Sequence, residues 1–452
     1  MTQIANHSLQ STPLGPIASD WKLGAVGDFV AELKAGVSVN AVETEGGCAA
    51  DDVGVLKSGA VLQGKFFPEQ HKVVVPTDRG RVATSVRADR VIISRMNTPA
   101  LVGESGYVEE DAPHLFLPDR LWQTEPSIEP HSQRWLSYWL QHPALRTLIA
   151  AAATGTSNSM KNISKETVLS LPVPRTPLAE QTRIAAILTA VDDKLDVIAR
   201  QIKATHTLKQ GLMQTLFSRG VGTQDADGRW VPHAEQKLSA MGMVPASWVV
   251  EPLDRYVSKV GSGVTPKGGS TSYQSSGIPL IRSQNVLVGR LWLDDVAYID
   301  EVQHNKMRNS ALEPEDVLLN ITGASIGRCA VLPRDFSEGN VNQHVCIIRT
   351  QPSLNPKFLC QYINSSFGQK QVAKFQAGGN REGLNYQQVR SFDVPVPSVA
   401  EQEKIVYLLE AVDSKERCLE RKQLQHQTLK RGLMQKLLTG EWRVKIDADM
   451  AA

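Results

Sequence analysis

The sequence predicts an α/β (α+β) protein with two mixed α/β domains joined by two long helices that form an antiparallel coiled coil. Three features of the chain predict this fold. The segment 180–217 recurs without gaps at 401–438, with 17 of 38 positions identical. Both copies space their apolar residues as a heptad seam. The regions before each copy hold short apolar runs between polar loops, which is typical of strands in a mixed domain.

The repeat extends, more weakly, into the two domains. Trp21 aligns with Trp248 and Gly36 with Gly263 at an offset of 227 residues, while the long segments align at 221. The offset drifts because the loops between these anchors differ in length. A repeat of this length is a whole domain with its helix rather than a small solenoid unit. Two domains that share a frame and differ in surface can recognise two different targets.

The composition bounds the class of protein. The 452 residues are enough for two or three domains, each with its own core. The 49 basic and 47 acidic residues nearly cancel, so only local clusters can argue for nucleic acid. The five cysteines form no Cys-x-x-Cys pair, which argues against structural zinc or disulfides. We expect a cytoplasmic protein, because the sequence shows no secretion signal and no membrane-spanning apolar run.

Helix signals and a glycine-rich stretch divide the chain into six segments. Thr176 and Pro177 mark the first helix start, and Ser398 with Glu401 forms a capping box at the second. Glycines and a polar run between the first helix and the second domain are typical of a linker. The predicted segments are a first domain 1–172, a first long helix 173–219, a linker 220–245, a second domain 246–393, a second long helix 394–445 and a disordered tail 446–452.

Shorter elements are predicted inside the domains. The runs 278–281 and 316–320 are strand-like and bounded by turn residues. The segments 132–153 and 355–374 carry helix periodicity before a glycine. We therefore expect both domains to mix helices and strands.

The two long helices carry matching apolar stripes. Glu416 and Gln423 are polar where the first copy has Leu195 and Ile202, which lowers stability but helps to fix register. Each helix spans roughly 40 residues, or ~60 Å, and needs a partner for its stripe. The other copy is the obvious partner, and a hairpin that merely braces the fold is the alternative to a dedicated spacer. The predicted seam and subunit-interface residues are Ile184, Leu188, Val191, Leu195, Ile198, Ile202, Ile405, Leu409, Val412 and Leu419.

Polar loops distinguish the second domain. Their small residues allow close approach to phosphate, while Arg, Asn and Gln side chains can pair with base edges, so the loops suit duplex DNA. Ordinary turns are the alternative, and Arg282 could instead pair with a carboxylate of its own domain. The loops are 261–266, 281–286, 320–327, 342–344 and 378–383.

The first domain carries a cluster of arginines. Five lie within 17 residues, and only Asp78 and Asp89 relieve their charge. A DNA-binding surface and a solvated charged face explain this cluster equally well. The arginines are Arg79, Arg81, Arg87, Arg90 and Arg95.

The sequence offers no catalytic constellation. The run 59–66 nearly spells a phosphate-binding loop, but Phe66 stands where a magnesium-binding Ser or Thr is needed. No Asn-Pro-Pro-aromatic or Asp-Pro-Pro-aromatic methyltransferase motif occurs. His304 and His344 have no neighbours at metal-ligand spacing. We therefore expect neither catalytic residues nor a metal site.

Several segments in combination carry a family resemblance. They are 394–402 and its copy 173–181, 429–435 and its copy 208–214, and the loops 261–266 and 320–327. With these segments the chain resembles the specificity subunits of type I restriction-modification systems. The resemblance covers essentially the whole chain.

The resemblance implies a division of labour. Each globular domain would be a target-recognition domain that reads one half of a split, asymmetric duplex DNA site. The paired helices would set the gap and dock two modification subunits, which methylate adenine with S-adenosylmethionine. A motor-nuclease restriction subunit, with ATP and magnesium, would join for cleavage. This chain would itself be non-catalytic and hold no cofactor.

The loops and the resemblance together predict a set of DNA contacts. Alternatives from other classes are a methyltransferase or nuclease that acts alone, and a coiled-coil scaffold that binds no DNA. The predicted contacts are Arg87, Arg95, Asn97, Ser157, Asn158, Ser262, Thr265, Lys267, Arg282, Gln284, Asn285, Thr322, Ser325, Asn342, Gln343, Asn380 and Arg381.

Overall fold

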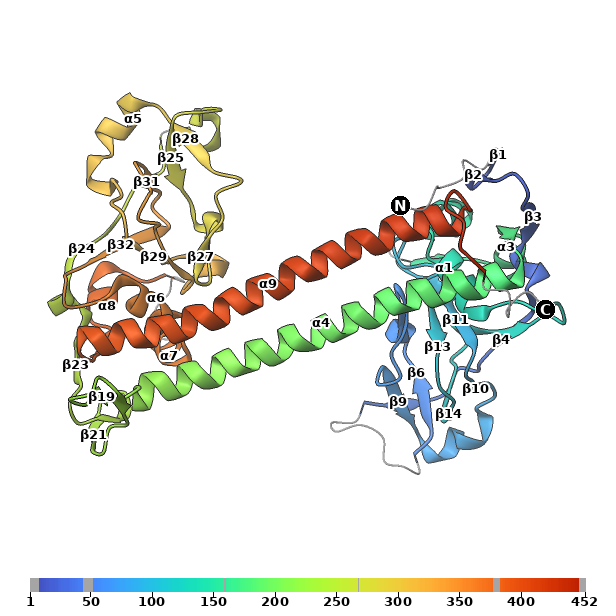
Figure 1. Cartoon of the computed structure of the whole chain (residues 1–452), viewed down its shortest axis with the longest axis horizontal. Coiled ribbons are helices and arrows are strands. Elements are labelled where there is room, and N and C mark those ends of the chain that lie inside the picture. Colours follow the sequence, from blue (N-terminus) through green and yellow to red (C-terminus); the bar gives the residue numbers. More distant parts are fainter. Residues whose placement is uncertain (1–7, 44–51, 158–159, 267, 377–382, 447–452) are drawn as a thin grey trace. The chain divides into compact units, whose positions relative to one another are not determined.

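Two structural units make up the chain in the computed structural model (Figure 1). The structure describes residues 8–43, 52–157, 160–266, 268–376 and 383–446. Unit 1 comprises 1–198 with 422–452, and unit 2 comprises 199–421. Each unit therefore holds one globular domain and one part of each long helix.

Two long helices run through both units. They are α4, Leu178–Arg219, and α9, Val399–Leu438, drawn green and red in Figure 1. In unit 1, Asp192 accepts an ion pair from Lys430 at 2.7 Å, and Leu188 shares a core with Leu437. In unit 2, Lys209 pairs with Asp413 at 2.6 Å. Numbering falls along one helix as it rises along the other, so the predicted antiparallel coiled coil is confirmed.

The ion pairs repeat the internal symmetry of the sequence. Asp192 and Asp413 are equivalent positions of the repeat, and so are Lys209 and Lys430. The same pair is thus made once in each unit. The seam agrees with the predicted heptads, because its positions are buried or half-buried. The buried ones are Ile184, Leu188, Ile198, Ile405, Leu409 and Leu419, and the half-buried ones are Val191, Leu195, Ile202 and Val412.

The helix boundaries differ from those predicted. The predicted starts at 173 and 394 fall in strands, β18 Pro172–Arg175 and β33 Asp393–Val396. Prolines in both runs favour extended backbone, so each helix begins only after the following turn. The second helix ends at 438 rather than 445, because Gly440 takes a left-handed conformation with φ 72°.

The predicted linker and tail also differ in part from expectation. Residues 220–245 hold two hairpins, which are β19 Thr223–Gln224 with β20 Trp230–Val231 and β21 Gln236–Ser239 with β22 Gly242–Pro245. The tail predicted to be disordered lies outside the described residues from 447 onward.

Unit 1 contains two larger sheets. The first has the order β4-β15-β11-β13-β8-β7, and its strands are Val30–Ala35, Leu121–Pro126, Arg90–Ser94, Ser105–Val108, Gly64–Phe66 and Val61–Leu62. The second has the order β10-β14-β6-β9-β5, with Ser85–Val86, Ala112–Phe116, Gly54–Leu56, His71–Val74 and Ala41–Val42. Smaller pairings join β1 Leu9–Thr12 to β2 Gly15–Ala18, β3 Lys22–Ala25 to β18, and β12 Met96–Asn97 to β17 Met160–Asn162 and β16 Thr154–Ser157. The helices are α1 Gln133–Leu140, α2 Pro143–Ala152 and α3 Lys165–Leu169.

Unit 2 is built on the same plan. Its main sheet has the order β24-β32-β29-β30, with Val257–Ser262, Val345–Thr350, Val317–Asn320 and Cys329–Val331. A second sheet, β28-β25-β31, comprises Ala297–Ile299, Ile278–Ile281 and Asn340–Val341. Two further pairs are β23 Val249–Pro252 with β33, and β26 Val286–Leu287 with β27 Arg290–Leu291. The helices are α5 Glu301–Lys306, α6 Pro356–Asn364, α7 Ser366–Gln376 and α8 Tyr386–Arg390.

The predicted short elements occur with one refinement. Both predicted strands are present as β25 and β29. The two predicted helical segments are each broken in two, as α1 and α2 and as α6 and α7. Pro143 opens a new helix in unit 1. In unit 2 the backbone is extended at Ser365 and then packs tightly, since a Cβ on Gly368 would lie 2.4 Å from the Ile363 carbonyl oxygen.

The repeated Glu-Gln dipeptide fastens each long helix to its globular domain. The Gln181 side-chain oxygen accepts from the Ser132 backbone N–H at 2.9 Å, and Gln402 accepts from Asn355 at 2.7 Å. These bonds hold the first residue before α1 and before α6. All four repeated Glu and Gln side chains are buried. The identity of this dipeptide in the two copies therefore has a structural cause.

Candidate nucleic-acid interface

Four polar loops of unit 2 meet at one edge of its main sheet. The strands β24 and β29 end at this edge, and β32 begins there, because Ser262 pairs with Cys346 and Asn320 with Val345. β30 begins at the same edge, next to β29. The predicted loops 261–266, 320–327 and 342–344 all start or finish here. We call this set of loops the unit 2 recognition edge.

Hydrogen bonds between loops hold the recognition edge together. The Thr265 N–H donates to the Gln343 side-chain oxygen at 3.3 Å. The Thr322 hydroxyl lies 2.5 Å from Nδ1 of His344. The Ser262 N–H donates to the Tyr386 hydroxyl at 3.2 Å, which brings in the start of α8. The loops are thus positioned by one another rather than free to move singly.

A glycine allows two of these loops to approach closely. A Cβ on Gly263 would lie 1.7 Å from the Val341 carbonyl oxygen, so only glycine fits. The equivalent Gly36 of unit 1 meets the Leu117 carbonyl oxygen at 1.6 Å. The glycine pair that aligned in the sequence therefore marks the same backbone crossing in both domains.

Most predicted contacts of the second domain do come together. The recognition edge gathers residues whose polar groups line neighbouring loops. His344 and Tyr386 were missed as candidates. The run Asn342-Gln-His344 carried a signal for His344, whereas Tyr386 is 66 residues away from Asn320 in sequence and joins only through the fold. The predicted residues at this edge are Ser262, Thr265, Thr322, Ser325, Asn342 and Gln343.

The loop after β25 needs a correction. Asn285 is fully buried, and its amide donates to the backbone oxygens of Trp292 and Asp295 at 2.9 and 2.8 Å. It therefore supports the loop and does not reach DNA. The Arg282 guanidinium lies 3.8 Å from an Asp295 carboxylate oxygen, as the alternative stated for it required. Gln284 is exposed and donates to the same carboxylate at 2.7 Å.

Some predicted contacts have no described position. Asn158, Lys267, Asn380 and Arg381 lie outside the described residues. Ser157 ends strand β16, which pairs with β17.

Unit 1 forms a corresponding recognition edge. Here β4 and β11 end while β15 and β13 begin, because Ser94 pairs with Leu121 and Ile93 with Ser105. Arg95 follows β11 directly, and its Nε donates to Asn162 at 3.3 Å. Asn97 lies in the adjacent strand β12.

Further basic residues border this edge. The Arg95 N–H donates to the backbone oxygen of Arg120 at 2.9 Å, and the Arg120 side chain is exposed. Arg120 was missed because it is isolated in the sequence from the other arginines. Lys161, which pairs with Asn97 across β17 and β12, adds another cation. The edge therefore presents positive charge together with hydrogen-bonding side chains.

The predicted arginine cluster does not form one surface. Arg87 precedes β11, whose first residue pairs with Val108 at the opposite end of the sheet from Arg95. Sequence proximity misled here because a strand crosses the whole sheet between these two arginines. The other three arginines pair with carboxylates within unit 1. These pairs are Arg79 with Asp52, Arg81 with Asp78 and Arg90 with Glu125.

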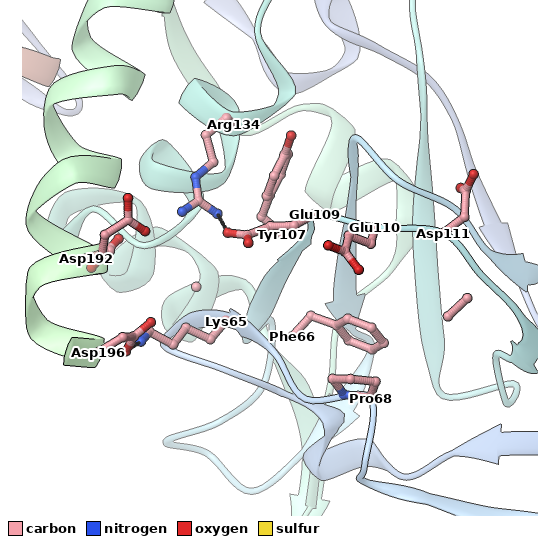
Figure 2. Close-up of a pocket in the computed structure, with 13 residues that line it drawn as sticks. Lys65, Phe66, Pro68, Tyr107, Glu109, Glu110, Asp111, Arg134, Asp192 and Asp196 are labelled. Carbon is pink, nitrogen blue, oxygen red and sulfur yellow. Dashed lines mark hydrogen bonds and ion pairs between the residues drawn. The ribbon is translucent and has the colours of Figure 1, made fainter. Parts of the chain in front are cut away.

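A cavity of about 360 Å³ lies between the unit 1 domain and α4 (Figure 2). Arg134 reaches across it to Glu109 at 3.3 Å. Burial, followed by the hydrogen bond to Asp89, raises the pKa of Tyr107 to about 12. Carboxylates outnumber cations here, so the cavity disfavours phosphate and is not part of the DNA interface. The lining carboxylates are Glu109, Glu110, Asp111, Asp192, Asp193 and Asp196, and the cations are Lys65 and Arg134.

Two other features were sought in the described ranges. No group of three or more His, Cys, Asp or Glu side chains there is arranged to hold a metal ion. None of the helices in the described part of the chain has the length and apolar character needed to cross a bilayer.

Comparison with known proteins accounts for the recognition edge. Residues 257–427 match the family described as "Type I restriction modification DNA specificity domain". This segment is a type I DNA specificity domain. It contains the whole main sheet of unit 2 and most of α9. The resemblance drawn from the repeated segments is thereby confirmed.

Relatives extend the likeness beyond the specificity domain. The chain is 22% identical over 444 residues to the putative type I restriction enzyme MjaX specificity subunit of Methanocaldococcus jannaschii, which covers 97% of each chain. It is 24% identical over 356 residues to the type I restriction enzyme EcoBI specificity subunit of Escherichia coli, covering 72% of each.

Solved structures show the same fold. The S subunit of a type I restriction-modification system from M. genitalium superposes with a TM-score of 0.59 at 17% identity, over 92% of this chain and 96% of that one. A chain from a study of assembly and conformational transition in the type I system gives a TM-score of 0.53 at 15% identity, over 94% and 99%. The predicted fold class, two mixed domains with an antiparallel coiled coil, is confirmed.

Proposed function

We propose that this protein is the DNA specificity subunit of a type I restriction-modification system. Each recognition edge reads one half of a split, asymmetric duplex site. The observation that carries this proposal is the pair of equivalent edges, built on the same four-strand frame and lined by different residues. A shared frame with different polar side chains is what two different half-sites require. The specificity domain in unit 2 and the relatives support the same role.

The proposal includes partners that supply the chemistry. Two modification subunits, which use S-adenosylmethionine, dock on the paired helices and methylate adenine, and a restriction subunit with ATP and magnesium joins for cleavage. Relatives named as specificity subunits of restriction enzymes support partners of this kind. Base flipping and methyl transfer then belong to the modification subunit, and this chain contributes recognition alone.

The first test exchanges one recognition domain. Residues 246–390 are replaced by the matching domain of a relative with a different target, and the methylated sites of a host that carries the system are sequenced. We expect one half of the methylated sequence to change, while the other half and the spacer stay, because each edge is built within one unit. A reciprocal exchange of residues 1–172 should change the other half. If either exchange altered both halves, independent reading would be wrong, and methylation indifferent to this chain would refute the function itself.

The second test concerns the gap between the half-sites. Four residues are inserted into α4 within 195–207 and four into the facing stretch of α9, so that the antiparallel seam continues. The insertions lengthen the helices by ~6 Å and turn them by ~40°, which corresponds to about one or two base pairs of DNA. We expect a longer spacer between unchanged half-sites in the methylated sequence. A methylated sequence with its old spacer would show that the helices do not set the gap.

A further inference from the structure

The repeated helix segments keep residues that the fold does not explain. In the aligned segments 180–217 and 401–438, 17 pairs of positions are exposed in both copies. Ten of these pairs have diverged, as exposed positions are free to do. The other seven are identical. They are Ala190/Ala411, Lys194/Lys415, Arg200/Arg421, Thr207/Thr428, Leu208/Leu429, Gly211/Gly432 and Gln214/Gln435.

The identical exposed pairs lie on one side of the helices. We assign position a of each heptad to Leu188, Leu195, Ile202 and Lys209. All seven identical pairs then occupy positions c, f and g, and none of the six exposed pairs at b and e is identical. Residual similarity after duplication would be spread over both sides. The identity is therefore confined to a face, which we call the shared face.

The opposite side, at b and e, is occupied by the recognition domains. In unit 1 the Tyr138 hydroxyl donates to Asp192 at 2.9 Å, on position e. In unit 2 the Gln361 amide donates to Asp413 at 2.9 Å, also on position e, and Lys357 pairs with Glu410 on position b at 2.7 Å. The two recognition domains differ, so the helix side that contacts them has diverged. The shared face takes no part in these contacts.

The antiparallel arrangement assembles the shared face twice. In an antiparallel pair, position g of one helix lies beside position g of the other. Unit 1 takes Ala190 and Lys194 from α4 and the equivalents of 207, 208, 211 and 214 from α9, and unit 2 takes the complementary copies. Each unit thus presents the same patch. The patches are Ala190, Lys194, Thr428, Leu429, Gly432 and Gln435 in unit 1, and Ala411, Lys415, Thr207, Leu208, Gly211 and Gln214 in unit 2.

The chemistry of each patch suits a protein partner. Leu208 and Leu429 are 55% and 50% exposed although they sit among charged and polar neighbours. A glycine follows three residues after each leucine, and a Cβ added there would meet no atom within 4 Å, so a partner helix can approach the backbone. Lys194 and Lys415 supply a cation at the border of each patch.

We propose that each patch docks one copy of the same protein, so that a single chain holds two copies through equivalent contacts. This inference rests on the proposed function, in which that protein is the modification subunit. The occupant presents an apolar side chain to the leucine and a carboxylate to the lysine. Two copies of one surface on a single chain call for two copies of one partner, and the conservation of only this face follows.

The test counts bound modification subunits by native mass spectrometry of the assembled complex. We expect two copies on the unaltered chain, one on Leu208→Glu, one on Leu429→Glu and none on the double variant. Leu424→Glu is the matched control, because Leu424 is a 60% exposed leucine on position b of the same helix, and it should keep two copies. Lys194→Glu with Lys415→Glu provides an independent pair that should weaken binding of both copies.

The outcomes separate this inference from the proposed function. Two copies retained by the double leucine variant, or an equal loss in Leu424→Glu, would overturn the docking surfaces while leaving DNA specificity intact. Loss of both copies in each single variant would overturn their equivalence. An unaltered chain that binds no modification subunit would instead refute the proposed function.

Discussion

Replacing Glu401 with leucine is expected to lower the free energy of unfolding of unit 2 by about 4 kcal/mol. The carboxylate of Glu401 is buried and accepts from the backbone N–H groups of Val221 and Gly222, from Trp248 Nε1 at 2.9 Å and from His233 Nε2 at 2.9 Å. Leucine fills much of the same volume but leaves these four donors without an acceptor. Each unsatisfied buried donor costs about 1–3 kcal/mol, although water can reach some of them.

Urea unfolding followed by circular dichroism measures this loss. Glu403→Leu is the matched control, because Glu403 lies two residues further along the same helix and is exposed, so its change should stay within about 0.5 kcal/mol. A loss below about 1 kcal/mol for Glu401→Leu would show that the carboxylate is not the fastening point of the helix, the linker and the domain.

Gly263→Ala is expected to abolish recognition of one half-site and to lower the free energy of unfolding by about 3 kcal/mol or more. The added Cβ would lie 1.7 Å from the Val341 carbonyl oxygen, so the loop after β24 must move away from the loop after β31. That movement breaks the bond from Thr265 to Gln343 and separates the side chains of the unit 2 recognition edge.

Gly261→Ala gives a close comparison, because a Cβ there meets nothing within 4 Å. Binding to the cognate duplex and to duplexes altered in either half should show no change for Gly261→Ala. Gly263→Ala should lose discrimination at one half only. Gly36→Ala, whose Cβ would lie 1.6 Å from the Leu117 carbonyl oxygen, should lose the other half. Full discrimination by Gly263→Ala would place the reading residues away from this edge.

The helices could be predicted from the sequence because their signals are local and repeated. The heptad spacing identified every seam residue, and the antiparallel pairing followed from two stripes in one chain. The helix starts were misplaced, since residues 172–175 are held as a strand by pairing with β3, about 150 residues earlier in the chain. A pairing that distant leaves no trace in local periodicity.

The recognition edges were predictable only in outline. Loop composition located Ser262, Thr322 and Gln343, because small polar residues between apolar strands mark exposed turns. It could not distinguish Asn285, whose amide is consumed by backbone oxygens inside the loop. It also grouped Arg87 with Arg95, which strand β11 separates. Side-chain direction and strand crossing decide these cases, and both come from tertiary structure.

The two ends of the chain meet in unit 1, and this governs the order of folding. The Ala18 N–H donates to the Thr439 oxygen at 2.8 Å, and Arg443 pairs with Asp20, 423 residues away. During synthesis, unit 2 can complete its contacts once residue 421 has emerged, whereas the first domain must wait for the last segment of the chain. Contacts this distant in sequence form slowly. Premature termination near residue 422 would therefore leave the later-made unit intact and the earliest-made domain unfinished.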